Sequence, residues 1–555
     1  MQALQSVIDL LSAGKRLEID LIWLLFLTLF VALFVPLSLI VWKLKDKYKI
    51  ITLIIGVVSI LAIVNYIVLA VFYLTIADFA DPAEANVTAV SWLLQRGEVL
   101  YPKLDATERY INNYGPFSYI INGLFLNILK PSFFSAKIAG VLSGISSLFL
   151  IFLIAAQRLN LRCAAIVSAV TSLCFLALTS ASGLIISSFW VRPDSLLLLC
   201  TTLGLFAVLR GNRSAAVVIS AIALGISTNL KITAFLHFLP IYVLLYYRFG
   251  FAAMGLSLMG SVLVAALPFV APQISLRNYW TWLQQVKQKG INSEQIIKNL
   301  LWIGFAALPI AIAAIQLQFT NACCFKQWVW HHRLYGLLLI IGIIINAVIG
   351  ATRGALENNM LPFVPLLVYL FSDLLRSILR FGNAETTKIV VSIRLSAAIA
   401  FLVSISLAVY STESGLISRL TNAPGYLAVA DIEQFIKINP NRSIGMGYGA
   451  VSYQLSTYRP ALVFAGHPYL LDSASLMEMQ ASGLNNTPVN TLNALKSCQT
   501  EIWLIPKNNP PFQVYSYYPP LQKLFSDRFR KTFLDTYDRQ TQTEFYDAWV
   551  CKKLR

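Results

Sequence analysis

Long apolar runs alternate with short polar segments along the first three quarters of the chain. A run of roughly 17 to 25 apolar residues can cross a bilayer as a helix. About twelve such runs can be counted, near residues 20–42, 51–77, 134–156, 164–189, 195–209, 214–228, 232–247, 251–271, 299–318, 335–351, 360–376 and 390–410. This pattern predicts a polytopic α-helical membrane protein with about twelve transmembrane helices.

The pattern changes after residue 410, where short apolar runs are separated by many turn residues. GYLAVADIEQFIKINP and LMEMQASG favour helices, while SIGMGYGA, ALVFAG and EIWLIPK favour short strands. Alternating helix and strand signals predict an α/β domain over 411–555, which is long enough to bury its own core. The chain is therefore expected to consist of a membrane module, 1–410, and a soluble C-terminal domain.

The composition supports a membrane location. Of the 555 residues, 57% are hydrophobic and 12% are charged, whereas soluble proteins carry roughly 25% charged residues. The net charge of +17 is best explained by basic residues in short loops, so no nucleic-acid partner is predicted. No cleavable signal peptide is expected, because the first long apolar run begins only near Leu21.

Basic residues in the short loops set the predicted orientation. Lysines at 43, 45, 47 and 49 make the first loop cytoplasmic, and the basic loops near 158–162, 210–213, 326–333 and 376–380 then fall on the same side by alternation. The outer side receives the N-terminus, the loop 78–133, the segments 190–194, 229–231, 272–298 and 352–359, and the domain 411–555. We expect an integral protein of the inner or plasma membrane with an extracytoplasmic C-terminal domain.

The first outer loop is rich in acids where a helix is predicted to begin. Asp81 and Glu84 are three residues apart, so they would share one face of a helix over 81–95, just where the preceding apolar run leaves the bilayer. Asp78 lies one turn earlier. The structural alternative is a capping box, in which Asp81 caps the helix, Pro82 is its first residue and Glu84 completes the box.

Further charged residues recur next to apolar runs on the predicted outer side. They are Arg192, Asp194, Lys231, Lys287, Lys289, Arg353 and Glu357. A charge at membrane depth costs roughly 2.5 to 3.5 kcal/mol, so such residues usually mark a cavity or a pathway. The alternative is that each long side chain snorkels to the interface.

Cysteine and histidine usage adds one prediction. Cys498 and Cys551 are the only cysteines of the predicted outer domain, and such a pair in an oxidising compartment suggests a disulfide. Cys323–Cys324 has no partner His or Cys at a metal-ligand spacing. The nearby His331–His332 pair lies in a basic interfacial loop, which disfavours a metal site there. No nucleotide-binding or hydrolase motif is present in a usable context, so no cofactor is predicted, and a requirement for a divalent metal stays open.

Six segments, in their order along the chain, resemble the GT-C glycosyltransferases, the membrane enzymes that use lipid-phosphate sugars, such as protein mannosyltransferases and the aminoarabinose transferase of lipid A. DPAEANVTAVSWLLQRGEVLYP is similar to their first outer loop and NNYGPFSYIINGLF to the segment after it. The others are SAKIAGVLSGISSLFLIFLIA, FWVRPDSLLLLCTTLGL, NLKITAFLHFLPIYVLL and ATRGALENNMLPFVPLL. The resemblance covers roughly residues 80 to 460 and implies a GT-C-like membrane fold.

The resemblance implies an inverting transfer of a hexosyl or pentosyl group from a polyprenyl- or dolichyl-phosphate carrier to a glycan, lipid or protein acceptor at the outer face. It assigns the general base to a first-loop acid, for which Asp81 is preferred, then Glu84 and Asp78. Cations must stabilise the departing phosphate, and the candidates are Arg192, Lys231 and Arg353. The candidates for sugar or acceptor contacts are Tyr114, Asp194, Glu357 and Asn358.

Two departures from the family pattern limit this transfer of roles. Many members have adjacent Asp and Glu residues in the first loop, whereas the acids here are spread over 78–84. The aminoarabinose-type enzymes place a lysine before the proline that Pro116 matches, whereas this chain has Asn-Asn-Tyr-Gly at 112–115.

Two other functions remain as alternatives. A transporter or flippase for a lipid-linked sugar would also have many spans and a charged cavity, although the two halves of this chain show no repeat. A non-catalytic subunit of a polysaccharide complex would use the first-loop acids as helix caps only. The long polar early loop and the appended outer domain favour the transferase.

Overall fold

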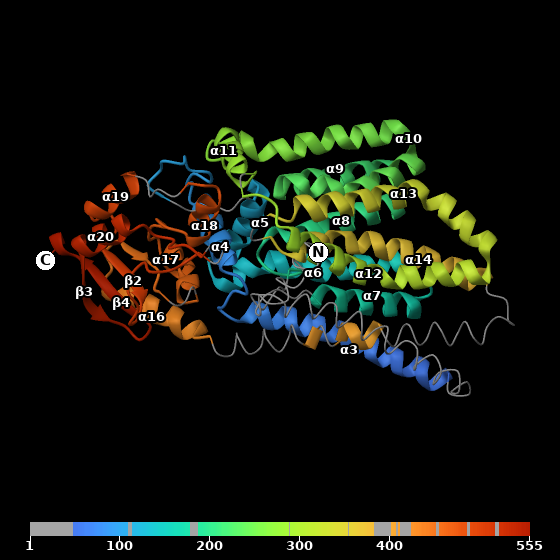
Figure 1. The fold of residues 1–555 in the computed structure, drawn as a ribbon, viewed down its shortest axis with the longest axis horizontal. Helices are drawn as coiled ribbons and strands as arrows, with labels where there is room; N and C mark the ends of the chain where they lie inside the picture. The colour runs from blue at the N-terminus through green and yellow to red at the C-terminus, as the bar shows by residue number, and fades with distance from the viewer. Residues whose placement is uncertain are drawn as a thin grey trace, which may run out of the picture.

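Figure 1 shows the computed structural model, in which a bundle of long helices carries a smaller part made of strands and short helices at one end. The structure describes residues 48–108, 114–177, 187–287, 289–352, 355–381, 401–406, 409–410, 423–450, 454–484, 489–516 and 521–554. The predicted span 20–42 and most of 390–410 lie outside these residues.

The bundle consists of apolar helices that pack side by side. They are α3 (Tyr48–Thr75), α6 (Phe133–Ala156), α7 (Leu161–Leu176), α8 (Pro193–Arg210), α9 (Arg213–Leu230), α10 (Phe235–Ala266), α12 (Ser293–Thr320), α13 (Ala322–Ile349) and α14 (Val364–Phe381). Within the described residues, eight helical stretches are long and apolar enough to cross a membrane. The chain therefore has the character of an integral membrane protein, as its composition predicts.

One of these stretches folds back on itself. Gly250 inside α10 has φ 82° and ψ 175°, which is not helical. The Tyr242 hydroxyl lies 2.8 Å from the Ser257 hydroxyl, fifteen positions later, whereas in a straight helix these residues would be about 22 Å apart. The two apolar runs predicted at 232–247 and 251–271 are thus the two arms of a helical hairpin.

Small residues on α6 let another chain segment approach closely. A Cβ atom on Gly140 would lie 2.1 Å from the Trp190 carbonyl oxygen, and one on Gly144 would lie 2.5 Å from the Ser188 carbonyl oxygen. Only glycine fits at these positions, as is common where elements pack tightly in membranes. The contact fixes the segment that leads into Arg192 and α8.

The C-terminal part contains a four-stranded mixed sheet in the order β1-β2-β4-β3. Its strands are β1 (Ile444–Met446), β2 (Ile502–Pro506), β3 (Tyr537–Gln542) and β4 (Tyr546–Cys551), with β1 parallel to β2 and the other pairs antiparallel. Its helices are α16 (Gly425–Ile438), α17 (Pro460–Phe464), α18 (Ser473–Ala481), α19 (Val489–Lys496) and α20 (Asp527–Thr536).

The strand predicted at ALVFAG is wrong, because these residues form most of the short helix α17. Pro460 occupies the first helical position, where its fixed φ favours a helix and its missing N–H costs no hydrogen bond. Phe464 packs edge-on against Trp92, with 6.4 Å between the ring centroids. The apolar side chains of α17 are thus buried against the first loop instead of pairing with the sheet.

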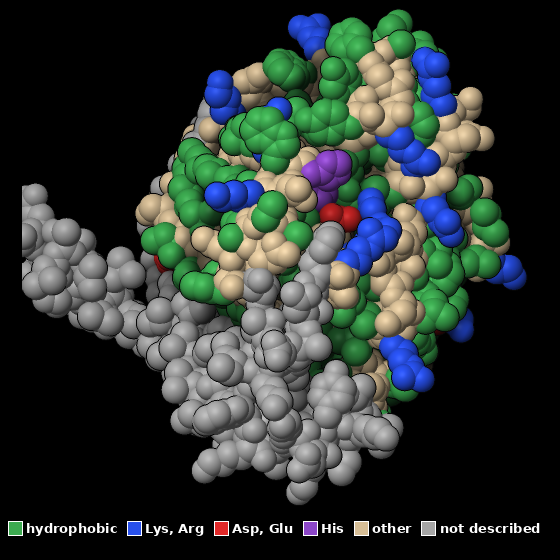
Figure 2. Space-filling view, turned by 90° about the vertical axis from the view of Figure 1, so that its right-hand side faces the viewer, with side chains coloured by type: hydrophobic (Ala, Val, Ile, Leu, Met, Phe, Trp, Pro, Cys, Tyr) green, Lys and Arg blue, Asp and Glu red, His purple; other side chains and the backbone are tan. Residues whose placement is uncertain are grey.

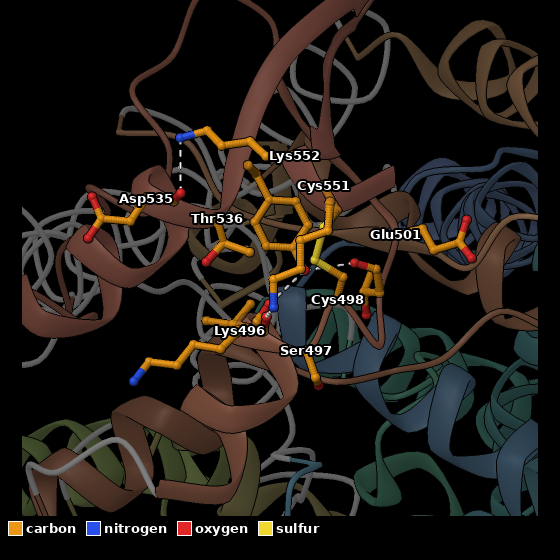
Figure 3. Close-up of a disulfide and its surroundings, with 12 residues drawn as sticks. Lys496, Ser497, Cys498, Glu501, Asp535, Thr536, Cys551 and Lys552 are labelled. Atoms are coloured by element: carbon orange, nitrogen blue, oxygen red, sulfur yellow. Dashed lines mark hydrogen bonds between the residues drawn. A yellow bond between two sulfur atoms is a disulfide. The ribbon is translucent and has the colours of Figure 1, made fainter. Parts of the chain in front are cut away.

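A disulfide joins a helix to the sheet (Figure 3). Cys498 follows α19, and Cys551 ends β4. Their sulfur atoms are bonded, and their Cα atoms are 6.1 Å apart. Close by, the Lys553 ammonium donates to the Lys496 carbonyl at 2.8 Å, so the last residues of the chain are held against α19.

The first loop contains two helices, α4 (Pro82–Gln95) and α5 (Pro116–Ile128). α4 lies between the bundle and the C-terminal part, as Figure 1 shows, and α5 packs on α4 and α6. Ala85 and Val90 of α4 share one buried apolar cluster with Tyr458 and Leu462 of the C-terminal part. The helix that begins beside Asp81 is therefore packed between the two parts of the molecule.

Candidate functional site

The turn that leads out of α3 into the first loop is held by one buried lysine. The Lys137 ammonium donates to the backbone carbonyls of Tyr73 and Ile76 at 2.9 Å and of Asp78 at 2.6 Å. Three acceptors use all three donors of an ammonium group. Lys137 is not among the predicted site residues, although a lone lysine in the apolar run of α6 is a signal that could have identified it.

Asp81 caps α4 and also faces a cation. Its Oδ1 accepts from the Ala83 N–H at 2.8 Å, and its own N–H donates to Glu84 Oε1 at 2.9 Å. Its Oδ2 lies 3.6 Å from Nη1 of Arg192. The capping box is therefore present, and it leaves the second oxygen of Asp81 directed at a guanidinium group. The carboxylate is 23% exposed, so it is in contact with solvent.

Glu84 is the more enclosed of the two acids. It is fully buried, and its Oε2 accepts from the Tyr73 hydroxyl and, at 3.0 Å, from the Val191 N–H. Burial is the largest influence on its carboxyl and raises its pKa, while the bonds from Tyr73 and Val191 oppose this. Glu84 thus ties α4 to α3 and to the segment before α8.

Asp78 is turned away from Asp81 and toward the C-terminal part. It is buried, and its carboxylate accepts from the Tyr458 hydroxyl. Tyr458 in turn accepts from the Gly425 N–H at 3.1 Å. The structure therefore places Asp78 at the junction between the first loop and the C-terminal part.

Charges of alternating sign continue from Asp81 across three elements. Arg192 precedes α8, and its Nε lies 3.9 Å from Oδ2 of Asp194. The Lys231 ammonium lies between α9 and α10 and donates to Oδ1 of Asp194 at 2.6 Å and to the Asn359 side chain at 3.0 Å. We call Asp81, Arg192, Asp194 and Lys231 the charged row. Residues more than 100 positions apart in the sequence form it.

Aromatic rings line the charged row. The Trp190 indole N–H donates to Oδ2 of Asp194 at 3.0 Å, and its ring lies 4.3 Å from the Arg192 guanidinium carbon. The Tyr114 ring lies 5.8 Å from that carbon and 6.0 Å from the Lys231 nitrogen. At such distances the ring faces attract both cations.

Tyr114 reaches this position because Gly115 packs on the segment 229–231. The Gly115 N–H donates to the Leu230 carbonyl at 3.1 Å, and a Cβ atom at Gly115 would lie 1.4 Å from the Asn229 carbonyl oxygen. Tyr114 and Gly115 therefore hold the segment before α5 beside Lys231.

The remaining candidates are placed as follows. Glu357 and Asn358 are buried in η4 (Glu357–Phe363), next to Asn359, which binds Lys231. Arg353 lies outside the described residues. Among the residues that are described, no group of three or more His, Cys, Asp or Glu side chains could hold a metal ion.

The described residues of the loops predicted on the outer side, 78–133, 190–194, 229–231, 272–298 and 352–359, meet at one end of the bundle. The first loop contacts 190–194 through Asp81 and Arg192, and it contacts 272–298 through the Leu100 N–H, which donates to the Gln273 carbonyl at 3.0 Å. The Asn292 N–H donates to the Ala351 carbonyl at 2.7 Å. The end of the bundle that the sequence pattern singles out is therefore assembled from several separate segments.

No family model and no curated protein matches this chain. Among solved structures, it is similar to ArnT from Cupriavidus metallidurans bound to undecaprenyl phosphate, with a TM-score of 0.52 and 13% identity over 88% of this chain and 97% of that one. For the same protein in the apo state the TM-score is 0.48, with 15% identity over the same shares. For the oligosaccharyltransferase AglB from Archaeoglobus fulgidus, in complex with an inhibitory peptide and a dolichol-phosphate, the TM-score is 0.41, with 9% identity over 83% and 70% of the two chains.

The first of these similarities extends over nearly the whole length of both chains. Because the identity is only 13%, this similarity shows a shared fold and nothing more. The chain therefore has the overall fold of ArnT.

Proposed function

We propose that this protein is an inverting glycosyltransferase that moves a sugar from a polyprenyl-phosphate donor to an acceptor at the outer face of the membrane. The observation that carries this proposal is the charged row. It places a partly exposed carboxylate, Asp81, beside Arg192, and Arg192 and Lys231 flank Asp194 at the end of an apolar bundle. A transfer from a lipid phosphate needs a base and a phosphate-binding group close together at the membrane surface.

The reaction follows from these positions. Asp81 accepts the proton of an acceptor hydroxyl, whose oxygen attacks the anomeric carbon from the side opposite the phosphate. The bond between that carbon and the phosphate oxygen breaks, and the electron pair leaves with the polyprenyl phosphate. Arg192 and Lys231 stabilise the negative charge on the departing phosphate, and the single displacement inverts the anomeric carbon. Arg353 remains a further candidate for the phosphate.

Asp81 suits the role of base better than the neighbouring acids do. The oxygens of Glu84 accept from three donors inside the protein, and the carboxylate of Asp78 is bound to Tyr458. Asp81 uses Oδ1 as a helix cap and directs Oδ2 toward the charged row. In this proposal Glu84 positions Asp81, because it holds the Asp81 N–H.

The same arrangement suggests which residues contact the sugar and the acceptor. Tyr114, Asp194, Glu357 and Asn358 stay candidates for contacts with the sugar or the acceptor. The Tyr114 ring lies near Arg192, Asp194 is paired with Lys231, and Glu357 and Asn358 precede Asn359, which also binds Lys231. With the basic loops in the cytoplasm, the charged row and the C-terminal domain lie outside it. The acceptor class, glycan, lipid or protein, and the choice of a hexosyl or pentosyl donor stay open, as does the use of a divalent metal.

Substitution of Asp81 tests the proposal. Asp81→Asn keeps a good helix cap but removes the proton acceptor, so turnover of polyprenyl-phosphate sugars should fall about 10²- to 10⁴-fold. Purified wild type, Asp81→Asn and Glu84→Gln are compared at matched thermal stability, with Asp105→Asn as a control elsewhere in the same loop. Hexosyl and pentosyl donors are both offered.

The outcomes separate the alternatives. Loss of activity in Glu84→Gln with activity kept in Asp81→Asn would make Glu84 the base. Wild-type activity in both variants would leave the first-loop acids as caps, as a non-catalytic subunit requires. Movement of the lipid-linked sugar across vesicles without transfer would favour a transporter or flippase.

A further inference from the structure

A second polar feature lies at the opposite end of the helix bundle from the charged row. There, a cavity of about 570 Å³ is lined by arginines, histidines and aromatic rings, among them Arg158, Arg248, Arg333, His331, His332 and Trp330. Figure 2 looks onto this end, where histidine and acidic side chains lie in a hollow with Lys and Arg side chains around it.

The arginines reach the cavity from three different parts of the bundle. Arg158 follows α6, Arg248 lies in the first arm of α10, and Arg333 lies in α13. Arg158 lies 3.3 Å from the carboxylate of Asp373, which also accepts from His332 at 2.8 Å. Asp373 lies directly behind these side chains, although neither it nor any other described Asp or Glu is among the residues that line the cavity. With one nearby acid for three guanidinium groups, the cavity carries an excess of positive charge.

The guanidinium groups are held in place. Nη1 of Arg248 donates to the Val208 carbonyl at 2.6 Å. The Arg333 guanidinium carbon lies 3.5 Å from the centroid of the Trp330 ring, and that of Arg158 lies 5.7 Å from the Tyr369 ring. Each guanidinium has five N–H donors, and these contacts use only some of them. The remaining donors can serve a ligand in the cavity.

The excess of basic residues at this end agrees with the positive-inside pattern. That pattern explains why basic residues are present, but it does not explain why three of them converge on one cavity. Side chains that snorkel to the interface spread into the headgroup layer. Here three arginines from separate helices converge on one hollow whose volume lies within the range of ligand pockets, roughly 300 to 1,000 Å³. Asp373 offsets one of the three positive charges, and the other two repel each other at the end of an apolar bundle unless a further anion lies between them.

We propose that this cavity binds a phosphate-bearing anion, which Arg158, Arg248 and Arg333 hold by charge-assisted hydrogen bonds. Guanidinium groups match the oxygens of a phosphate group better than any other side chain does. The phosphate belongs either to an anionic lipid headgroup or to a free phosphorylated small molecule that enters from the aqueous side. The cavity is separate from the charged row, and the proposal does not depend on the transferase function.

The test measures binding to the full-length protein. Purified protein is placed in nanodiscs of pure phosphatidylcholine, or in nanodiscs that also contain phosphatidylglycerol, and the retained lipids are counted by native mass spectrometry. Titration of glycerol phosphate into the phosphatidylcholine nanodiscs tests the soluble ligand. The variants are Arg158→Gln, Arg248→Gln, Arg333→Gln and all three together. Arg213→Gln is the matched control, because Arg213 is an exposed arginine at the start of α9 that does not line the cavity.

Each substitution is expected to weaken binding about fivefold and the triple variant about 100-fold, on the basis of the usual contribution of a basic residue near an anionic lipid. Retention of phosphatidylglycerol by the wild type and by Arg213→Gln, with loss in the triple variant, identifies a lipid headgroup. Saturable binding of glycerol phosphate with the same dependence identifies a free phosphorylated ligand. Binding of neither probe by the wild type, or equal binding by the triple variant and the control, overturns the proposal.

Discussion

Asn86 on the first-loop helix donates through Nδ2 to Oδ2 of Asp472 in the C-terminal part at 2.6 Å, across 386 positions of sequence. Both side chains are buried. Asp472 also accepts from the Tyr469 hydroxyl at 3.0 Å and from the backbone and the hydroxyl of Ser475. The C-terminal part is therefore bonded directly to the helix that Asp81 caps, so its packing helps to set the position of that acid.

Removal of the Asp472 carboxylate should loosen this junction. Asp472→Ala leaves the Asn86 amide and the Ser475 N–H buried without an acceptor, at a cost of about 3 kcal/mol or more. Thermal unfolding should begin at a lower temperature, and limited proteolysis should release the C-terminal part sooner. Asp527→Ala is the control, because that side chain is 77% exposed in its pair with Lys523. Equal effects of the two substitutions would show that the Asn86–Asp472 bond does not hold the junction together.

The membrane character and the position of the charged row could be predicted because both depend on patterns that are local in sequence. Apolar runs identify spans, and basic loops assign Arg192, Asp194 and Lys231 to one end of the bundle. The pairing of these residues could not be predicted, since it depends on how α8, α9 and α10 pack. Their order along the chain gave no sign that Asp194 lies between Arg192 and Lys231.

In the C-terminal part, local pattern was a weaker guide. β1 and β2 are fully buried short strands, and their apolar sequences identify them. β3 reads YDRQTQ and is mostly exposed, so it lacks the apolar residues by which we recognised strands. ALVFAG has the composition of a strand, but a proline at its start and a partner helix, α4, outside the domain make it helical. The roles of Lys137, Asn86 and Tyr458 were missed because each depends on a contact with a distant segment.

The stability of the first loop should depend on pH through Glu84. Its pKa is raised above the ordinary value of 4.5, chiefly by burial, so folding favours its protonated form. The resulting stabilisation is fully present below pH 4.5 and is lost as the pH rises through the raised pKa. The melting temperature of the wild type, relative to that of Glu84→Gln, should therefore increase as the pH is lowered through this window. The difference in melting temperature between the wild type and Glu98→Gln, a substitution at an exposed position in the same loop, should stay constant over this window. An equal change in both differences would exclude Glu84 as the source.

The disulfide should stabilise the C-terminal part against unfolding. Closing a loop between cysteines 53 positions apart contributes about 4 kcal/mol on the chain-entropy account. The double variant Cys498→Ser/Cys551→Ser should melt at a lower temperature than the oxidised wild type. Cys323→Ser, at an exposed free cysteine, should not. Peptide mapping of protein from its native membrane that found both thiols free would contradict the prediction.

If the proposed function is correct, loss of the Lys231 charge should weaken binding of a lipid phosphate, whereas loss of an exposed lysine charge in the first loop should not. Lys231→Gln should weaken binding of polyprenyl phosphate at least about tenfold, because a charge-assisted hydrogen bond in a partly buried site is lost. Lys103→Gln, at an exposed position in the first loop, is the control. The single substitution also leaves the Asp194 carboxylate buried without its ammonium partner, which costs about 3 to 5 kcal/mol in folding stability. The double variant Lys231→Gln/Asp194→Asn restores neutrality, so it should recover much of the melting temperature without recovering the affinity. Recovery of both would mean that Lys231 serves only to neutralise Asp194, and the phosphate would then be held by Arg192.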